Sequence, residues 1–593
     1  MAACWVALTF AMIEPLQAAL PNWDELSIDA LTLGLQLGKV ALVLLACLMP
    51  IAFASAWFAP LRAPAIWTAS CVAFWVQGDL FLWDYGTFDG SQLDWSAHAV
   101  KGWFEVGVWL GLLGFALWKA DWVTPRAPKI LAAIAVLQLA GLAGIVQQNS
   151  PYASRPPVAI GKESPASEFA TFSKGKNAIV VVLDAMQSDI LSAVLQSEAL
   201  DEEMPGGFVY YRNAISLYVS TKFSLQSILT SRAVPSRVNW VGWLAETMRR
   251  SLPAVLAEQG FDSRIASFST GSLACTRASS VLPCNTLAQL GAPDSARALK
   301  ADRRSEVSLL ARLAVFRLLP HLLKNRVYNE GSWLLPEIYP RRESSGIDPG
   351  LPAATRADIQ TLRSLTSHVR VVEGAPRFRF LHLNSVHFPG WAGSDCSADR
   401  SSRLRSRQMD TAQCVLGELF RFFRALDAAG VYDTSAIVVV ADHGSHQLRW
   451  VNKEAVGVPL EPAEAPGRGA IKSWWKALPV FLVKQPGARG ATLESDHPVS
   501  LCDVPNTVLD ALDIELEGAF ECESVTRSPR RTARFHYSYV EISNQKKRSR
   551  ESRNFYNFVP ILVEGHSWHG SSWRRCGKKC RLDADGPVEV DAD

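Results

Sequence analysis

Acidic, hydroxyl and imidazole side chains occur in this chain where predicted strands end or predicted helices begin. Asp184 ends the run NAIVVVLD, Asp442 and His443 end VVVADH, and Thr221 opens TKFSLQSILT. Two carboxylates, a hydroxyl and an imidazole suit one divalent ion, Zn²⁺ or Mn²⁺, with Ca²⁺ or Mg²⁺ as alternatives. Because a bound dication lowers the pKa of a ligating hydroxyl, these four residues predict a metal site in which Thr221 is the nucleophile and carries a covalent intermediate.

Thr221 is expected in the first turn of a helix, where free backbone N–H groups and the helix dipole favour developing negative charge. Ser220 and Ser224 flank it and are alternative nucleophiles. The stretch FLHLNSVHFPG places His382 and His387 in and after another predicted strand. His387 is expected to hold the transferring group or to protonate the leaving oxygen. His382 is either a substrate contact or a buried core histidine.

Alternating strands and helices must position these side chains. Apolar runs typical of buried strands alternate with helical patterns, which predicts a mostly parallel sheet with helices on both faces. Ligands bind beyond the carboxyl ends of the strands in such sheets, where these polar residues lie. The predicted strands are 177–184, 208–211, 263–268, 378–383, 435–441 and 479–483, and the predicted helices are 221–231, 250–259, 354–371, 407–428 and 503–512.

The first 150 residues have a different composition. Only 16 of these 150 residues are charged, whereas about a quarter of the residues are charged in a typical soluble domain. Five apolar stretches occur, at about 1–20, 38–58, 63–83, 102–118 and 130–147. Most have the length needed to cross ~30 Å of hydrocarbon, although Glu14 and Pro15 interrupt the first, for which a signal peptide is the alternative. An all-helical membrane domain is therefore predicted at 1–147, and a wholly soluble or disordered protein is excluded.

Charges between these stretches predict their orientation. Arg62 lies in one loop and Lys119, Arg126 and Lys129 in another, whereas the alternate loops are acidic. Because Lys and Arg stay on the cytoplasmic side, five spans place the N-terminus inside and everything after about residue 148 outside. The residues of the candidate site are therefore expected on the extracytoplasmic side of the membrane.

Eight of the 11 cysteines follow the membrane segment and fall into close neighbours, namely Cys275/Cys284, Cys396/Cys414, Cys502/Cys522 and Cys576/Cys580. An even number in an exported domain favours disulfides, and sequential pairing is the simplest connectivity. A zinc ribbon is the alternative, but no CxxC pair is present.

The composition divides the rest of the chain into three parts. Residues 148–176 are rich in Pro, Ser and Gly and indicate a linker before a catalytic domain at 177–525. Residues 526–593 form a basic extension, either a solvated surface or a face for anionic lipid or envelope polysaccharide. The formal net charge of +3 says little about partners, and no nucleic-acid partner is expected.

Together, the order and spacing of these clusters resemble the alkaline phosphatase superfamily, in particular the sulfatase-like branch with its membrane-anchored phosphoethanolamine transferases and lipoteichoic acid synthases. The resemblance covers about residues 175–525 and includes LPAVLAEQGFDSRIAS, LPVFLVKQPG and HPVSLCDVPNTVLDAL. It implies an α/β/α sandwich and a metal-dependent transferase in a bacterial inner membrane, with the catalytic domain on the periplasmic or extracytoplasmic side. Such an enzyme moves phosphoethanolamine or phosphoglycerol from a membrane phospholipid, through a phosphothreonine, onto an envelope glycan or lipid.

Two positions depart from the transferase pattern. The transferases usually have Glu where this chain has Asp184, which favours a phosphatase or sulfatase pattern. They also tend to carry a histidine where this chain has Ala455, and His446 and His497 are candidate replacements that would contact substrate. The alternatives are therefore a sulfatase-like hydrolase, acting on phosphodiesters or sulfuric esters, and a degenerate lipid-binding regulator. A sulfatase proper is disfavoured because Thr221–Leu225 lacks the Cys and Arg of its C-x-P-S-R-like motif.

Overall fold

The computed structural model divides into two compact units. The first comprises Met1–Ile160 and Leu299–Arg342, and the second Gly161–Ala298 and Glu343–Asp593. The structure describes the whole chain apart from residues 22–25, 27, 29, 84, 86–94, 150–163, 196–203, 235–239, 269–272, 274–282, 292–294, 330–332, 336–346, 349–350, 388–389, 400–403, 445–473, 528–532, 541–556, 576–579, 584–585 and 590–593.

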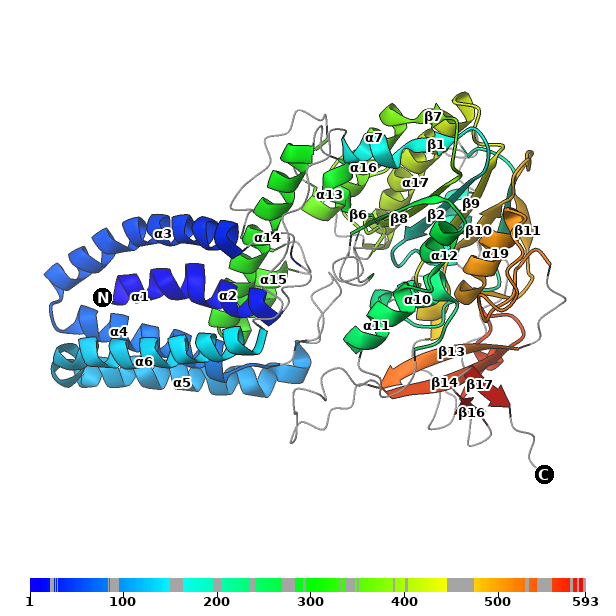
Figure 1. The fold of residues 1–593 in the computed structure, drawn as a ribbon. Coiled ribbons are helices and arrows are strands. Elements are labelled where there is room, and N and C mark those ends of the chain that lie inside the picture. The colour runs from blue at the N-terminus through cyan, green and yellow to red at the C-terminus, as the bar shows by residue number, and fades with distance from the viewer. Residues whose placement is uncertain are drawn as a thin grey trace. The chain divides into compact units, whose positions relative to one another are not determined.

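The first unit contains the predicted bundle of apolar helices (Figure 1). Four of its described helices are long and apolar enough to cross a membrane, namely Ala2–Ala19, Ala30–Phe58 (α3), Ala99–Trp118 (α5) and Ala120–Gln147, within α6 (Ala120–Asn149). The first of these runs through α1 (Ala2–Leu8), a π-helical turn (Thr9–Ile13) and α2 (Glu14–Ala19).

About five spans are predicted, and the stretch at 63–83 accounts for the difference. It forms α4 (Arg62–Trp75), which continues as a second π-helical turn at Val76–Leu80. Polar Gln77 and Asp79 interrupt the apolar sequence there. The Asp79 carboxylate accepts hydrogen bonds from the side-chain amides of Gln17 and Gln138, both at 3.2 Å. The stretch is helical as predicted, but four helices rather than five meet the criteria for a span.

Two helices from the middle of the chain belong to the same unit as the membrane helices. α14 (Ser295–Leu318) and α15 (His321–Tyr328) lie in the segment 299–342, which the catalytic sequence encloses on both sides. The side chain of Glu306 accepts a 2.9 Å hydrogen bond from the backbone N–H of Ile28. The chain therefore crosses between the two units three times.

The second unit is built on an eight-stranded sheet with the order β11-β3-β10-β9-β2-β8-β5-β6. Its pairs are parallel except those of β10, which runs antiparallel to both neighbours. The sheet is mostly parallel, as predicted. The strands are β2 (Asn177–Leu183), β3 (Phe208–Tyr211), β5 (Asp262–Ser267), β6 (Cys284–Thr286), β8 (Arg377–Leu383), β9 (Ser435–Val440), β10 (Phe481–Lys484) and β11 (Leu493–Ser495).

Helices cover both faces of this sheet (Figure 1). α10 (Thr221–Thr230), α12 (Leu252–Glu258) and α19 (Val504–Ala511) contribute to one apolar core, and α16 (Ala353–His368) and α17 (Leu404–Ala428) to the other. Because successive strand side chains point to opposite faces, the fully buried strand β2 serves both cores. Its alternate residues are Ala178, Val180 and Val182 in the first, and Ile179, Val181 and Leu183 in the second.

Residues after 526, predicted as a basic extension, contribute a small antiparallel sheet to the same unit. It has the order β13-β14-β15, with β13 (Ala533–Val540), β14 (Asn557–Glu564) and β15 (Trp573–Arg575). Arg534 of β13 is buried and donates to the carbonyl oxygens of Asn213 and Gly565. This sheet therefore packs on the chain segment that leads to Thr221.

Disulfides join two of the predicted cysteine pairs. Cys396 is bonded to Cys414 and Cys502 to Cys522, and Cys284 is also disulfide-bonded. The three cysteines of the membrane segment, Cys4, Cys47 and Cys71, are free. Cys275, the predicted partner of Cys284, and the side chains of Cys576 and Cys580 lie outside the described residues.

Candidate active site

Three neighbouring strands bring the predicted acidic and histidine residues to one edge of the sheet. Asp184 directly follows β2, Asp442 follows β9 on one side of it, and His382 lies near the end of β8 on the other. The three strands are parallel, so their carboxyl ends meet at the same edge. Thr221 is the first residue of α10, as predicted, after the N-cap residue Ser220.

The Thr221 hydroxyl lies against this group. Its Oγ1 is 3.5 Å from Oδ2 of Asp184 and 3.4 Å from Nε2 of His443. The same Nε2 is 3.4 Å from Oδ2 of Asp442 and 3.9 Å from Oδ1 of Asp184. The four residues predicted as metal ligands are therefore brought together around one small space.

Backbone contacts fix the imidazole of His443. Its Nδ1 lies 2.9 Å from the carbonyl oxygen of Gly444, which assigns the ring proton to Nδ1 and leaves the lone pair of Nε2 directed at the carboxylates. A side chain at Gly444 would place its Cβ 2.8 Å from the carbonyl oxygen of Trp475. The Asp-His-Gly sequence thus needs glycine because the backbone approaches closely there.

Three buried atoms at this edge have no hydrogen-bond partner in the part of the chain that the structure describes: Oδ1 of Asp184, Oδ2 of Asp442 and Nε2 of His382. One ligand atom from each of these residues lies within 4.8 Å of the others. Buried charged atoms that accept or donate no hydrogen bond are costly, and oxygen and imidazole ligands in this arrangement suit a divalent cation. The residues therefore fit the predicted metal.

The residue after Asp184 has an unusual backbone. Ala185 is fully buried and has a φ of 53°, in the left-handed region that alanine rarely adopts. Its N–H donates a 2.9 Å hydrogen bond to Oδ1 of Asp442, which also accepts from the backbone N–H of His443. Strain of this kind is characteristic of functional sites. Here the strained turn after Asp184 is hydrogen-bonded to the side chain of Asp442, which fixes the two aspartates relative to each other.

Charges around Asp184 keep it ionised. Burial would raise the pKa of its carboxyl group, but the contact with His382 and the charges of three nearby histidines lower that pKa to about 2. The three are His382, His387 and His443. Burial would likewise lower the pKa of His382, whereas its contact with Asp184, at 3.5 Å, raises it. The carboxylate of Asp184 is thus anionic, and a bound cation could stabilise it in place of the histidine charges.

His382 and His387 are held differently. Nδ1 of His382 is 3.0 Å from the hydroxyl of Ser267, which lies at the end of the next strand, β5. His387 is mostly buried in the turn after β8, where its N–H donates to the carbonyl oxygen of Asn384. The sequence predicts His382 to be either a substrate contact or a core histidine. In the structure its side chain is fully buried and lies next to Asp184, one of the aspartates that could bind a metal.

Asp358 and Ser267 were not predicted, and they support these histidines. Asp358 is fully buried on α16, and its Oδ2 accepts hydrogen bonds from the N–H groups of Asn384 and Ser385, at 2.8 and 2.6 Å. Burial raises the pKa of Asp358 to about 7, and the hydrogen bonds from Ser385 oppose that rise. Ser267 ends a predicted strand at the same edge of the sheet, so its position could have indicated its role. Nothing in the sequence around Asp358 distinguishes it from a surface residue.

The alternative nucleophiles are placed differently from Thr221. Ser224 is fully buried, and its hydroxyl donates a 2.8 Å hydrogen bond to the carbonyl oxygen of Tyr218. Ser220 occupies the N-cap position of α10, outside the helix, and its side chain makes no capping hydrogen bond there. Of the candidate substrate contacts, His497 lies between the edge strand β11 and Val499, and its N–H donates to Ser495. His446 lies outside the described residues.

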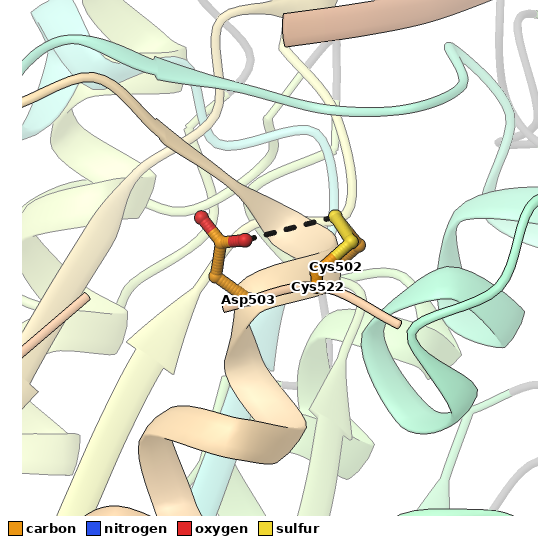
Figure 2. A group of neighbouring side chains, drawn as sticks. All are labelled: Cys502, Asp503 and Cys522. Atoms are coloured by element: carbon orange, nitrogen blue, oxygen red, sulfur yellow. Dashed lines mark hydrogen bonds between the residues drawn. A yellow bond between two sulfur atoms is a disulfide. The ribbon is translucent and has the colours of Figure 1, made fainter. Parts of the chain in front are cut away.

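A second group of potential metal ligands is ruled out by its chemistry. Cys502, Asp503 and Cys522 lie close together (Figure 2), but the two sulfurs are joined in a disulfide and are not available as thiolates. Oδ1 of Asp503 is 3.7 Å from Sγ of Cys502. Its Oδ2 accepts a 2.8 Å hydrogen bond from the N–H of Ser500, which caps a short helix. This group is structural.

Comparison with known proteins is consistent with this site. A model of the sulfatase family matches residues 176–514. No curated protein matches the chain.

The chain also resembles several solved structures at low sequence identity. A protein of the alkaline phosphatase superfamily from Vibrio parahaemolyticus is 12% identical, with a TM-score of 0.39 over 72% of this chain and 84% of that one. The lipoteichoic acid synthase LtaP from Listeria monocytogenes is 12% identical, with a TM-score of 0.35 over 72% and 91%. The C-terminal periplasmic domain of EcEptC from Escherichia coli is 11% identical, with a TM-score of 0.34 over 68% and 96%.

Proposed function

Because this chain belongs to the sulfatase family, we propose that it is a membrane-anchored, metal-dependent phosphotransferase. It takes a phospho-headgroup, phosphoethanolamine or phosphoglycerol, from a membrane phospholipid and passes it to a hydroxyl of an envelope glycan or lipid. One observation carries the proposal: Oγ1 of Thr221, at the start of α10, lies within 3.5 Å of Asp184 and His443. Beside it, carboxylate oxygens of Asp184 and Asp442 lack hydrogen-bond partners among the described residues.

Thr221 carries the group between donor and acceptor. Its Oγ1 forms a bond to phosphorus while the bond from phosphorus to the diacylglycerol oxygen breaks, and diacylglycerol leaves with a proton. An acceptor hydroxyl then attacks the phosphothreonine, the bond between phosphorus and Oγ1 breaks, and Thr221 regains its proton. The positive end of the α10 dipole, at Thr221, stabilises negative charge in both steps.

The other residues hold and orient. Asp184, Asp442 and His443 are the proposed ligands of the divalent ion, and His382 lies beside them. When bound, that ion lowers the pKa of a neighbouring hydroxyl and neutralises developing charge on phosphate oxygens. His387 is the proposed general acid for the leaving oxygen.

Membrane anchoring supports a transferase. Donor and acceptor are both held at a bilayer, and the first unit has four helices able to cross one. In the proposed orientation, which counts the helical stretch at 63–83 as a fifth span, the catalytic unit lies on the periplasmic side of an inner membrane. Disulfides such as Cys396–Cys414 are stable there.

A hydrolase of phosphodiesters or sulfuric esters is the second candidate, in which water replaces the acceptor. The observation that favours it is Asp184, whose carboxylate takes the place at which the transferases usually have Glu. Such an enzyme releases the headgroup or inorganic product without any acceptor.

Intact mass of the full chain tests the proposal. The protein in mixed micelles is incubated with Mn²⁺ or Zn²⁺ and either phosphatidylethanolamine or phosphatidylglycerol, alongside Thr221→Ala and the flanking control Ser220→Ala. We expect diacylglycerol release and a headgroup-phosphate adduct on the wild type and on Ser220→Ala, and neither on Thr221→Ala. The adduct mass identifies the donor. Absence of diacylglycerol release from every form with either lipid would refute the transferase.

A further inference from the structure

Exposed apolar side chains are concentrated in one short segment of the chain outside the membrane helices. Among the described residues after 160, seven large apolar side chains are exposed. Two of them, Phe268 and Leu493, belong to the catalytic unit. The other five are leucines of the segment 299–342, namely Leu309, Leu322, Leu323, Leu334 and Leu335. Five of the seven exposed apolar side chains therefore belong to this one segment.

The same segment is basic. Residues 299–342 contain nine Lys and Arg against four Asp and Glu. Leucines combined with an excess of positive charge are typical of helices that lie at a membrane surface, where apolar side chains enter the acyl boundary and cations face anionic headgroups.

A buried ion pair seats the segment on the membrane helices. The guanidinium of Arg317, on α14, lies 3.2 Å from Oε2 of Glu14, which is fully buried. Its other terminal nitrogen donates to Oε1 of Gln17 at 3.2 Å and to the carbonyl oxygen of Gly78 at 3.0 Å. A Cβ at Gly78 would lie 2.8 Å from Glu14 and 2.9 Å from Leu318. The contact is therefore close as well as charged.

Two of the three partners of Arg317 lie in or next to π-helical turns. Glu14 directly follows the turn Thr9–Ile13, and Gly78 lies within Val76–Leu80. Such turns are uncommon and are often found at functional sites. The membrane helices are thus locally distorted where α14 docks.

Apolar packing extends this contact. Val307 and Leu310 of α14 lie in a buried cluster with Leu26, Ile28 and Leu33.

At the start of α15, the ring of His321 stacks on Tyr85, and the backbone N–H of His321 donates a 2.6 Å hydrogen bond to the Glu105 side chain. A Cβ at Gly102 would lie 2.5 Å from the His321 ring. The docked face of the segment is therefore closed, and its exposed leucines belong to the remaining surface.

We propose that the segment 299–342 is a membrane-interface element: Arg317 and Glu14 seat it on the spanning helices, and its exposed leucines and basic charge bind the lipid of the bilayer that those helices cross. The chain thereby returns to the membrane from within the catalytic sequence. This attachment is independent of the reaction at Thr221.

Cutting the linker tests the attachment. A protease site is placed within residues 150–160 of the full chain, which is reconstituted in vesicles of phosphatidylethanolamine and phosphatidylglycerol, cut, and floated on a density gradient. We expect the fragment from the cut to the C-terminus to float with the vesicles. The triple variant Leu322→Ser, Leu323→Ser and Leu334→Ser should lower its partition into the vesicle fraction by about tenfold. Leu493→Ser, a control on the exposed edge of the catalytic unit, should not.

The ion pair is tested in the same assay. Arg317→Glu should release the fragment, Glu14→Arg combined with Arg317→Glu should restore binding, and Arg326→Glu, an equal charge change at an exposed position of α15, should have less effect. If the C-terminal fragment of the protein without substitutions leaves the vesicles after the cut, the proposal is overturned. Binding of the triple leucine variant equal to that of the wild type also overturns it, because the exposed leucines can be replaced without disturbing the core.

Discussion

The backbone N–H of Tyr537 donates a 2.7 Å hydrogen bond to the carbonyl oxygen of Leu217, just before the helix that begins with Thr221. The ring of Tyr537 stacks on Tyr218, with centroids 5.5 Å apart. Phe558 of β14 contacts Tyr218 and Phe223 edge-on, at 5.2 and 5.3 Å. The C-terminal sheet thus supports the segment that carries the proposed nucleophile.

Phe558→Ala should therefore reduce both stability and activity. Removing a buried ring of this size costs about 3–5 kcal/mol, and the cavity lies directly under α10. We expect a lower thermal midpoint and, at temperatures where the variant is folded, a lower kcat. Leu493→Ala, at an exposed position, is the control. An unchanged kcat in folded Phe558→Ala would show that the sheet does not position Thr221.

His536 should make the second unit sensitive to acid. Burial lowers the pKa of this histidine to about 4, although a 2.7 Å hydrogen bond from its Nδ1 to the carbonyl oxygen of Ser216 favours the protonated form. The unfolded chain binds the proton near pH 6.5, so stability is complete above that pH and falls by about 3 kcal/mol as pH approaches 4. Thermal midpoints from pH 7.5 to 4 should fall less steeply for His536→Gln than for the wild type. Parallel curves would contradict this assignment.

Asp442→Asn should lose the divalent ion. Even outer partners of metal ligands change affinity or activity by about 10–100-fold, so a direct ligand should change activity by more. Elemental analysis of purified protein and turnover after chelation and re-addition of Mn²⁺ or Zn²⁺ measure both effects. Asp503→Asn, beside the Cys502–Cys522 disulfide, is the matched control and should keep the metal. Equal metal content in wild type and Asp442→Asn would remove Asp442 from the site.

Asp358→Asn should act through the turn that carries His387. The carboxylate of Asp358 accepts hydrogen bonds from the backbone N–H groups of Asn384 and Ser385. In Asp358→Asn, the side-chain NH₂ group would face one of these N–H groups, and two donors cannot form a hydrogen bond. We expect kcat to fall by about tenfold, equivalent to losing one buried hydrogen bond, with metal content and KM little changed. Ser385→Ala keeps its backbone N–H and removes only the hydrogen bond that the Ser385 hydroxyl donates to the same carboxylate, so it should lower kcat less. Loss of metal in parallel with kcat would instead indicate collapse of the whole site.

The parts that could be predicted from sequence are those with local signals. The uninterrupted apolar run at 177–183 marked β2, and the change from β-branched to helical pattern at Thr221 marked α10. Parallel strands then brought Asp184 and Asp442 together without any need to know their side-chain contacts.

The rest depends on partners distant in the chain. Asp79 disrupts an apolar stretch, and its compensating partners Gln17 and Gln138 lie in two other helices. Asp358 acquires its role from the turn after β8. The membership of 299–342 in the membrane unit depends on Arg317 meeting Glu14. The residue pattern within a single helix or strand does not predict such contacts between residues far apart in the chain.

The discontinuous membrane unit has a consequence for biosynthesis. Gln17 and Arg317, which are hydrogen-bonded, are separated by 300 residues. At ~5–20 residues per second, a ribosome needs roughly 15–60 s to make that interval, and during it Glu14 is in the nascent helix without its guanidinium. The N-terminal helices must therefore wait, incompletely assembled, until part of the catalytic sequence has been synthesised. A chain that stalls before residue 317 would present an unneutralised acid among apolar helices, a feature that membrane quality-control proteases could recognise.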